Sequence, residues 1–239
     1  MCKKLCGDLV IELTRRCNMA CQHCLRGCAQ AIDINKELIR KAIYPFDRIN
    51  TLTLTGGEPS LVPRLISYTI ECLIEHEVEL GAFYIVTNGK VYSPSMVRTL
   101  RRAYQYADEK DMCCLTVSVD PFHDDNYEVL KRYENEIFYH PDKISPRIED
   151  YLINEGRAYE NGIGIRNLDP RCTINSEYIY DYTNHDGDDV LVVSDNLIYV
   201  TAIGDVLLEC DLSYENQELY SIGNLNHSSF IDIVESHIE

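Results

Sequence analysis

The chain has 239 residues, of which 45% are hydrophobic and 26% are charged, so it fits one globular domain or one domain with a small appendage. Its formal net charge of −17 argues against a nucleic-acid backbone or an anionic membrane surface as the main partner. The sequence shows neither an apolar run of membrane-spanning length nor the apolar core of a signal peptide, so we expect a cytoplasmic protein.

Strand and helix patterns alternate through the first two thirds of the chain. Strand patterns lie at residues 9–13, 49–55, 80–89 and 113–120, helical patterns lie at 35–44, 62–76, 93–104 and 124–138, and a less regular fifth pair lies at 150–162. Ser93 followed by Pro94 predicts the start of the third helix. This alternation predicts an α/β fold with a parallel sheet that curls into an incomplete barrel, because only five or six units precede residue 170.

The rhythm changes after Asp169. The pattern of residues 190–215 predicts short strands, with a hairpin-like turn at Ile203–Asp205. The pattern of residues 230–238 predicts a final helix. We therefore divide the chain into a partial barrel over residues 1–169 and a small β-rich extension over residues 170–239.

Eleven cysteines in a chain without a secretion signal indicate metal or redox chemistry rather than a disulfide framework. Some fit as small buried hydrophobic residues, as we expect for Cys72, Cys113 and Cys114. Cys2 and Cys6 are expected to lie in a frayed, exposed terminus.

Cys17, Cys21 and Cys24 occupy one short loop after the first strand, and Cys28 follows. Their spacing lets three thiolates converge on one metal centre. With Cys28 as a fourth ligand the loop would close a structural zinc site, whereas three thiolates would leave one iron of an iron–sulfur cube open. The loop alone is compatible with both metals.

A second motif, Gly56–Pro59, ends the second strand with the sequence GGEP. Barrel active sites lie at this edge of the sheet. The two glycines would let a ligand approach the backbone closely, and Glu58 can take up an ammonium group. The motif favours catalysis, because a zinc knuckle needs no ammonium site on a neighbouring strand.

Residues Cys17–Cys24, CNMACQHC, match the CxxxCxxC motif of the radical S-adenosylmethionine (SAM) enzymes, and Gly56–Pro59 matches the GGEP motif of the same enzymes. The chain resembles this family over residues 8 to about 165. The resemblance implies a partial (βα)6 TIM-type barrel and one 4Fe–4S cluster on Cys17, Cys21 and Cys24. SAM would chelate the open iron, so Cys28 would not be a ligand. Reductive cleavage of SAM would give a 5′-deoxyadenosyl radical that abstracts hydrogen from a substrate.

The resemblance also suggests further SAM contacts. Ser118 and Asp120, after the fourth strand, would bind the ribose; the alternative is a strand-end cap with an Asp-Pro turn. Asn88 would face SAM or adopt a left-handed turn. Arg157 would pair with the SAM carboxylate or lie solvated at a helix start. His123 is a candidate catalytic proton donor or relay, or else a surface histidine.

The extension resembles the shortened C-terminal extensions of SPASM and twitch radical SAM enzymes. It offers only Cys172 and Cys210, which argues against an auxiliary cluster. We therefore expect an oxygen-sensitive radical SAM enzyme that acts on a peptide or protein side chain, with an electron donor such as flavodoxin or ferredoxin. Since the motif begins at Cys17, we expect no leader-binding module before the barrel, and a peptide would need a carrier or direct docking.

Three alternatives remain. The enzyme could modify a small metabolite, or it could activate a partner by making a glycyl radical on it. The alternative from a different class is a non-catalytic zinc-binding module on Cys17, Cys21, Cys24 and Cys28.

Overall fold

The computed structural model describes residues 3–123, 127–141, 152–165, 180–183, 189–192 and 197–237. The strands are β1 (Lys3–Thr14), β2 (Arg48–Gly56), β3 (Glu79–Thr87), β4 (Cys114–Val117), β5 (Tyr180–Thr183), β6 (Asp189–Val192), β7 (Leu197–Val200), β8 (Asp205–Leu207) and β9 (Gly223–Asn224). The helices are α1 (Lys36–Ile43), α2 (Pro63–Glu75), α3 (Pro94–Tyr106), α4 (Tyr127–Tyr133), α5 (Gly156–Glu160), α6 (Tyr214–Leu219) and α7 (Phe230–Glu235), with the 3-10 turns η1 (Pro59–Leu61) and η2 (Lys110–Met112). No helix in these ranges is both long and apolar enough to span a membrane.

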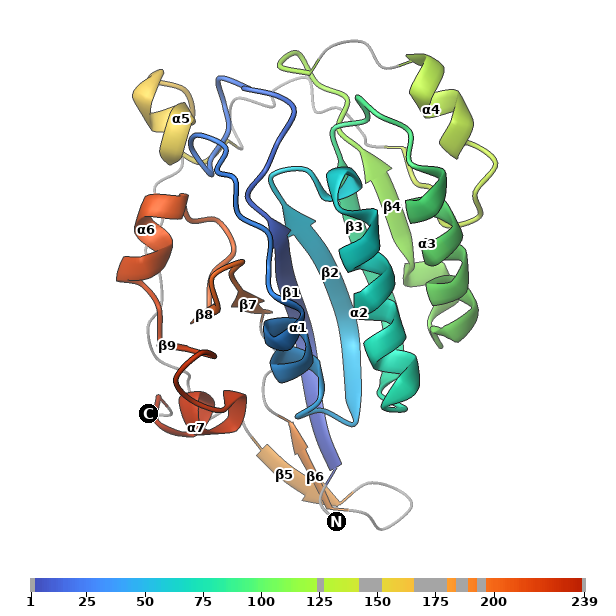
Figure 1. The fold of residues 1–239 in the computed structure, drawn as a ribbon, viewed down its shortest axis with the longest axis vertical. Helices are drawn as coiled ribbons and strands as arrows, with labels where there is room; N and C mark the ends of the chain where they lie inside the picture. Colours follow the sequence, from blue (N-terminus) through green and yellow to red (C-terminus); the bar gives the residue numbers. More distant parts are fainter. Residues whose placement is uncertain are drawn as a thin grey trace.

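The sheet has the order β4-β3-β2-β1-β7-β8-β9, and β1 to β4 are parallel, as predicted. Figure 1 shows α1, α2 and α3 on one face of the sheet, and the four parallel strands ending at one common edge. Ser93 caps α3 by accepting a hydrogen bond from Met96 N, and Pro94 opens the helix, which confirms the predicted start. The loops that follow these strands therefore lie close together at one edge of the sheet.

The second half of the chain completes the sheet on the other side of β1. β7 pairs with β1 in parallel, and β8 returns antiparallel to β7 through the predicted turn at Ile203–Asp205. The sheet thus runs without a break across the predicted boundary at residue 169, and the division into two domains stays a prediction. At the predicted fifth pair, α5 is present, while residues 152–155 form no strand beyond a single bridge at Ile153.

For the cysteines outside the loop, the observed burial differs clearly from the prediction at one residue, Cys6. Cys72 and Cys113 are buried as expected, and Cys114 is half-buried. Cys6 is fully buried in β1 opposite Ile49 of β2, so the prediction of a frayed, exposed terminus is wrong for this residue. The reason is that β2 and β6 both pair with the first residues of β1, which orders the strand from its start. Cys2 and Cys172 lie outside the described residues.

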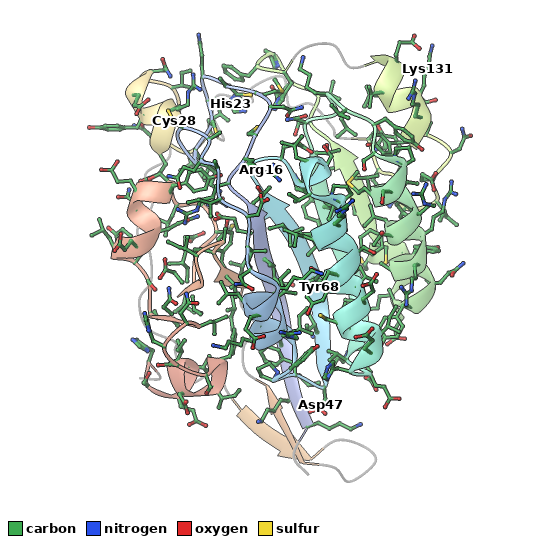
Figure 2. The ribbon with its side chains drawn as sticks, in the orientation of Figure 1. Arg16, His23, Cys28, Asp47, Tyr68 and Lys131 are labelled. Carbon is green, nitrogen blue, oxygen red and sulfur yellow. The ribbon has the colours of Figure 1, made fainter. Side chains whose placement is uncertain are left out.

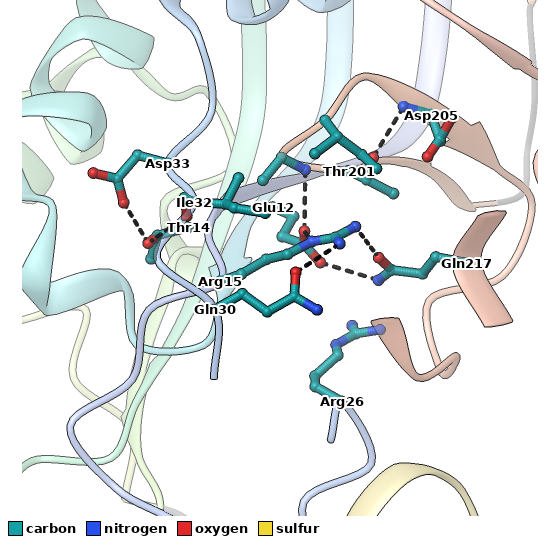
Figure 3. A network of polar contacts seen from close by, with 12 residues as sticks. Glu12, Thr14, Arg15, Arg26, Gln30, Ile32, Asp33, Thr201, Asp205 and Gln217 are labelled. Carbon is teal, nitrogen blue, oxygen red and sulfur yellow. Dashed lines mark hydrogen bonds and ion pairs between the residues drawn. The ribbon is translucent and has the colours of Figure 1, made fainter. Parts of the chain in front are cut away.

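A buried carboxylate joins β1 to the C-terminal segment (Figure 3). Glu12 is fully buried and accepts hydrogen bonds from Arg15 Nε at 2.8 Å and from Ala202 N at 3.0 Å. Its other oxygen accepts from Tyr199 Oη at 2.7 Å and from Gln217 Nε2 at 3.0 Å. Burial by itself raises the pKa of Glu12, but the charges of Arg26 and Arg15 and the hydrogen bonds from Arg15 and Gln217 lower it below its ordinary value. No local pattern in the sequence indicates this network.

Replacing Glu12 by Leu should therefore destabilise the fold strongly. The Arg15 guanidinium, only 4% exposed, would lose its buried counter-charge, and breaking such a pair costs about 3–5 kcal/mol of unfolding free energy. Urea unfolding followed by circular dichroism measures the loss. The control is Glu37→Gln, which breaks an exposed pair with Arg40 on α1 and should leave the unfolding midpoint unchanged. A loss below about 1 kcal/mol in Glu12→Leu would contradict a structural role for the network.

Candidate functional site

The cysteine loop is closed at its base by backbone hydrogen bonds. Arg15 N donates to Ile32 O at 2.8 Å, and Gln30 N donates back to Arg15 O at 2.9 Å. Two successive turns inside the loop run from Cys24 N to Cys21 O and from Gly27 N to Cys24 O. Figure 2 shows the loop beyond the end of β1, with Arg16, His23 and Cys28 labelled along it. The loop therefore stands at the same edge as the ends of the parallel strands.

The three predicted ligands face a common hollow, whereas Cys28 does not. Cys17, Cys21 and Cys24 are half-buried and line both a cavity of about 340 Å³ and a smaller one of about 50 Å³. Burial and the neighbouring Cys24 and Cys17 thiols raise the pKa of Cys21 to about 11. Cys28 is exposed and lines neither cavity. The arrangement favours a three-thiol metal centre over a four-thiol zinc site.

Gly56 and Gly57 bring the end of β2 against the start of the cysteine loop. Gly57 N donates to Thr14 O at 2.7 Å, and Glu58 N donates to Arg16 O at 2.8 Å. A Cβ on Gly57 would stand 2.3 Å from Arg16 O, and a Cβ on Gly56 would stand 2.2 Å from Thr14 O. From the sequence, these glycines are expected to admit a ligand close to the backbone. Both do line the cavity, but the closest approach is that of the chain to itself.

Glu58 links the ends of β2 and β3. Its carboxylate is 1% exposed and accepts hydrogen bonds from Ser60 N at 2.9 Å, Thr87 Oγ1 at 2.6 Å and Asn88 N at 2.7 Å. Oε1 takes two of these bonds and Oε2 takes one, so one acceptor position remains on Oε2. Glu58 and the buried Pro59 both line the larger cavity, so the predicted ammonium contact needs only this remaining position.

Asn88 turns its amide toward the cysteine loop. Its Nδ2 donates to Asn18 Oδ1 at 2.8 Å and lies 3.8 Å from Cys17 Sγ. The left-handed residue of this turn is Gly89, with φ of 67°, so the alternative that gave Asn88 that conformation is wrong. Contact with SAM stays a prediction for Asn88, which lines the larger cavity.

The segment after β4 holds the next predicted residues. Ser118 N donates to Thr87 O at 2.9 Å, and Ser118 lines the larger cavity. The Asp120 carboxylate accepts from Phe122 N at 2.8 Å, His123 N at 3.1 Å and His123 Nδ1 at 2.7 Å. This is the local cap that was the alternative to ribose binding, and the ribose contact stays a prediction. His123 lines the same cavity, and its Nε2 lies 3.8 Å from Cys21 Sγ.

Arg157, the last predicted residue, lines the smaller cavity together with all three cysteines. Its backbone N–H donates to Cys24 O at 2.9 Å, which ties α5 to the loop. Three further residues, which no sequence motif indicates, contact the same region. Gly156 passes against Leu25 O, and Tyr214 N donates to Arg26 O at 3.0 Å, while Tyr214 and Arg26 also line the smaller cavity.

Curated relatives match less than half of the chain. A GTP 3′,8-cyclase of Synechococcus sp. strain CC9902 is 31% identical over 100 residues, which are 41% of this chain and 29% of that protein. A GTP 3′,8-cyclase of Synechococcus sp. strain WH7803 is 32% identical over 109 residues, 41% of this chain and 30% of that protein. The chain thus covers under a third of the length of either relative. No protein-family model matches the chain.

Solved structures share the fold over nearly the whole chain. BtrN in complex with AdoMet and 2-DOIA matches with a TM-score of 0.54 and 14% identity, over 97% of this chain and 83% of that one. Native anSMEcpe with bound AdoMet and Cp18Cys peptide matches with a TM-score of 0.58 and 12% identity, over 97% and 80%. This likeness shows the fold and confirms the predicted partial barrel. Membership of the radical SAM enzymes stays a prediction from the CxxxCxxC and GGEP motifs, with which the partial match to the cyclases agrees.

The resemblance to radical SAM enzymes implies a 4Fe–4S cluster and SAM as the cofactors. The residues present fit this pair. Three half-buried thiols and the GGEP segment line one cavity, and the fourth nearby thiol, Cys28, does not line it. Cys210 is the one other half-buried thiol of the extension in the described residues, and it lies beside Glu209 and Asp211.

Serine substitution tests which cysteines bind the metal. After anaerobic reconstitution, Cys28→Ser should keep about four irons per chain, whereas Cys21→Ser should lose most of them, because two thiolates do not retain a cube. Iron analysis and the visible absorption spectrum measure the difference. Equal loss of metal from both variants would instead indicate a four-thiol site.

Gly156→Ala should impair the loop without unfolding the sheet. Its φ is 52°, and a Cβ would stand 2.3 Å from Leu25 O and 2.6 Å from Gly27 N, so the loop must shift. The matched control is Gly162→Ala, which has a φ of 65° but nothing within 4 Å, so it suffers only the backbone strain of about 1–2 kcal/mol. We expect clearly less iron per chain in Gly156→Ala than in this control. The same iron content in both would show that α5 does not position the loop.

Proposed function

We propose that this protein is an enzyme that reductively cleaves SAM and abstracts a hydrogen atom from a substrate. The observation that supports the proposal best is one cavity that Cys17, Cys21 and Cys24 line together with Gly56–Pro59. When bound, the cluster supplies the electron that splits SAM into methionine and a 5′-deoxyadenosyl radical. The chain's own residues hold, orient and shield the reactants.

In this proposal each wall of the cavity has its own task. Cys17, Cys21 and Cys24 hold the cluster, and the remaining acceptor position of Glu58 takes the SAM ammonium group through a charge-assisted hydrogen bond. Arg157 offers its planar fork to the SAM carboxylate from the smaller cavity.

The ribose and the reacting carbon would lie toward the far side of the larger cavity. There the Ser118 hydroxyl can bind a ribose oxygen, and Asn88 can bind a second polar group of SAM. Met19, Val86, Leu152 and Ile153 supply apolar lining. Such a lining excludes water, which protects a reactive radical from side reactions.

For the substrate we propose a peptide or protein side chain. The support is the shared fold with anSMEcpe, whose structure holds a bound peptide. A small-molecule substrate is the second candidate, because BtrN, with the same fold, holds 2-DOIA and the curated relatives are named as GTP cyclases. Activation of a partner by formation of a glycyl radical is a third. Flavodoxin or ferredoxin is the proposed electron donor, and the cytoplasm is the proposed location.

Anaerobic reconstitution tests the enzyme proposal. The wild-type protein should bind about four irons and, with dithionite and SAM, release 5′-deoxyadenosine and methionine, which chromatography detects. Cys21→Ser should release neither. A colourless protein that holds zinc and resists reconstitution would contradict the proposal. Once cleavage is established, deuterium transfer into 5′-deoxyadenosine from labelled peptides or labelled small molecules distinguishes the substrate classes.

Arg157→Met should weaken SAM binding while leaving the cluster intact. A hydrogen bond to a charged group contributes about 1.5–3 kcal/mol, which corresponds to an increase in Kd of about 10- to 150-fold. Calorimetry on the reconstituted protein measures the affinity. Arg64→Met, on the exposed surface of α2, serves as the control for loss of one positive charge. Equal SAM affinities in the two variants would show that Arg157 does not bind SAM.

A further inference from the structure

A relay of contacts leads from Asp120 through His123 to the sulfur of Cys21. Asp120 Oδ2 lies 2.7 Å from His123 Nδ1, and His123 Nε2 lies 3.8 Å from Cys21 Sγ. The two side chains of the pair are only 8% and 10% exposed. Neither SAM binding nor radical chemistry requires this relay, so it calls for its own explanation.

Several neighbours fix the position of the His123 ring. Phe122 N and His123 N both donate to Asp120 Oδ1, which holds the carboxylate in place. The His23 ring packs edge-on against the His123 ring at 5.3 Å and lies 4.4 Å from the Phe122 ring. With Nδ1 held by Asp120 and the ring packed on His23, Nε2 points to one sulfur atom.

The chemistry of that sulfur decides the direction of the hydrogen bond. An iron-bound thiolate has no proton, so its contact with Nε2 is a hydrogen bond only if Nε2 is the donor. The Asp120 carboxylate, whose Oδ2 lies 2.7 Å from Nδ1, fixes the orientation of the ring so that Nε2 faces the sulfur.

We propose that His123, positioned by Asp120, donates a hydrogen bond to Cys21 Sγ and thereby raises the reduction potential of the cluster. The physical reason is that a donor to a ligand sulfur stabilises the reduced cluster, which carries the more negative charge, more than the oxidised one. The inference rests on the proposed function, because it requires the cluster. It gives His123 and Asp120 roles as positioning residues around a metal ligand, with no contact to the reacting atoms.

A separate metal ion is the main competing explanation. His23, Asp120 and His123 offer three ligand atoms within 4.8 Å of one another. However, Asp120 Oδ1 already accepts two backbone N–H groups, and Oδ2 accepts from His123 Nδ1. Both oxygens of the Asp120 carboxylate therefore already have partners within the protein, which favours the hydrogen-bond relay over a metal site.

The test is a potentiometric titration of the reconstituted protein, followed by electron paramagnetic resonance at one pH and without SAM. His123→Leu should shift the potential of the cluster to a more negative value. Asp120→Ala should shift it in the same direction. The double variant should show no further shift beyond His123→Leu, because both changes remove one hydrogen bond. His123→Gln, which keeps an N–H near the position of Nε2, should fall between the wild type and His123→Leu.

Ser118→Ala is the matched control, because Ser118 lines the same cavity and has no contact with a cysteine sulfur among its hydrogen bonds to described residues. Its potential should equal that of the wild type. Unchanged potential in a His123→Leu protein with normal iron content would overturn the relay and leave the proposed function standing. Failure of the wild type to assemble a cluster would overturn both. Loss of one equivalent of zinc in His123→Leu, with the potential unchanged, would assign these residues to a metal site and also overturn the relay.

Discussion

Two backbone hydrogen bonds, from Gly57 N to Thr14 O and from Glu58 N to Arg16 O, hold the rest of the site together. They fasten the end of β2 to the first residues of the cysteine loop, at a separation that leaves no room for a Cβ. The thiols and the GGEP segment are thus fixed to each other by main chain rather than by side chains. Because hydrogen-bonded strand ends are rigid, a cofactor that needs both partners at set distances meets a preorganised site.

The C-terminal segment supports the same loop from the opposite side. Arg26 donates to Leu212 O at 2.6 Å, Tyr214 N donates to Arg26 O, and the Glu12 network joins β1 to Gln217. Arg15, whose backbone closes the base of the loop, also donates to Gln217 Oε1 at 2.7 Å. The extension is therefore part of the support of the cysteine loop, although it contributes none of the three thiols predicted to bind the cluster.

Local patterns sufficed to predict β1 to β4, α1 to α3 and the three clustered thiols. Apolar periodicity, the Ser93-Pro94 start and cysteine spacing are all signals carried within a few residues. The roles of Gly156, Tyr214 and the buried Glu12 could not be predicted. They depend on contacts between distant parts of the chain, and the bond from Gln217 to Glu12 spans 205 positions. Cys6 was mispredicted for the same reason, because its burial depends on strands that come later in the sequence.

The place of β7 beside β1 has a consequence for biosynthesis. On one side of β1 its neighbour β2 follows closely in the sequence, but the strands that pair on the other side, β6 and β7, begin only at Asp189 and Leu197, and the bonds from Ala202 and Gln217 to Glu12 come later still. Closing such long loops is entropically costly and slow. During synthesis, the first strand and the loop after it must wait until the strands and the helix of residues 197–219 have been made. The nascent chain therefore exposes its cysteines until then, and only afterwards gains a rigid site for metal.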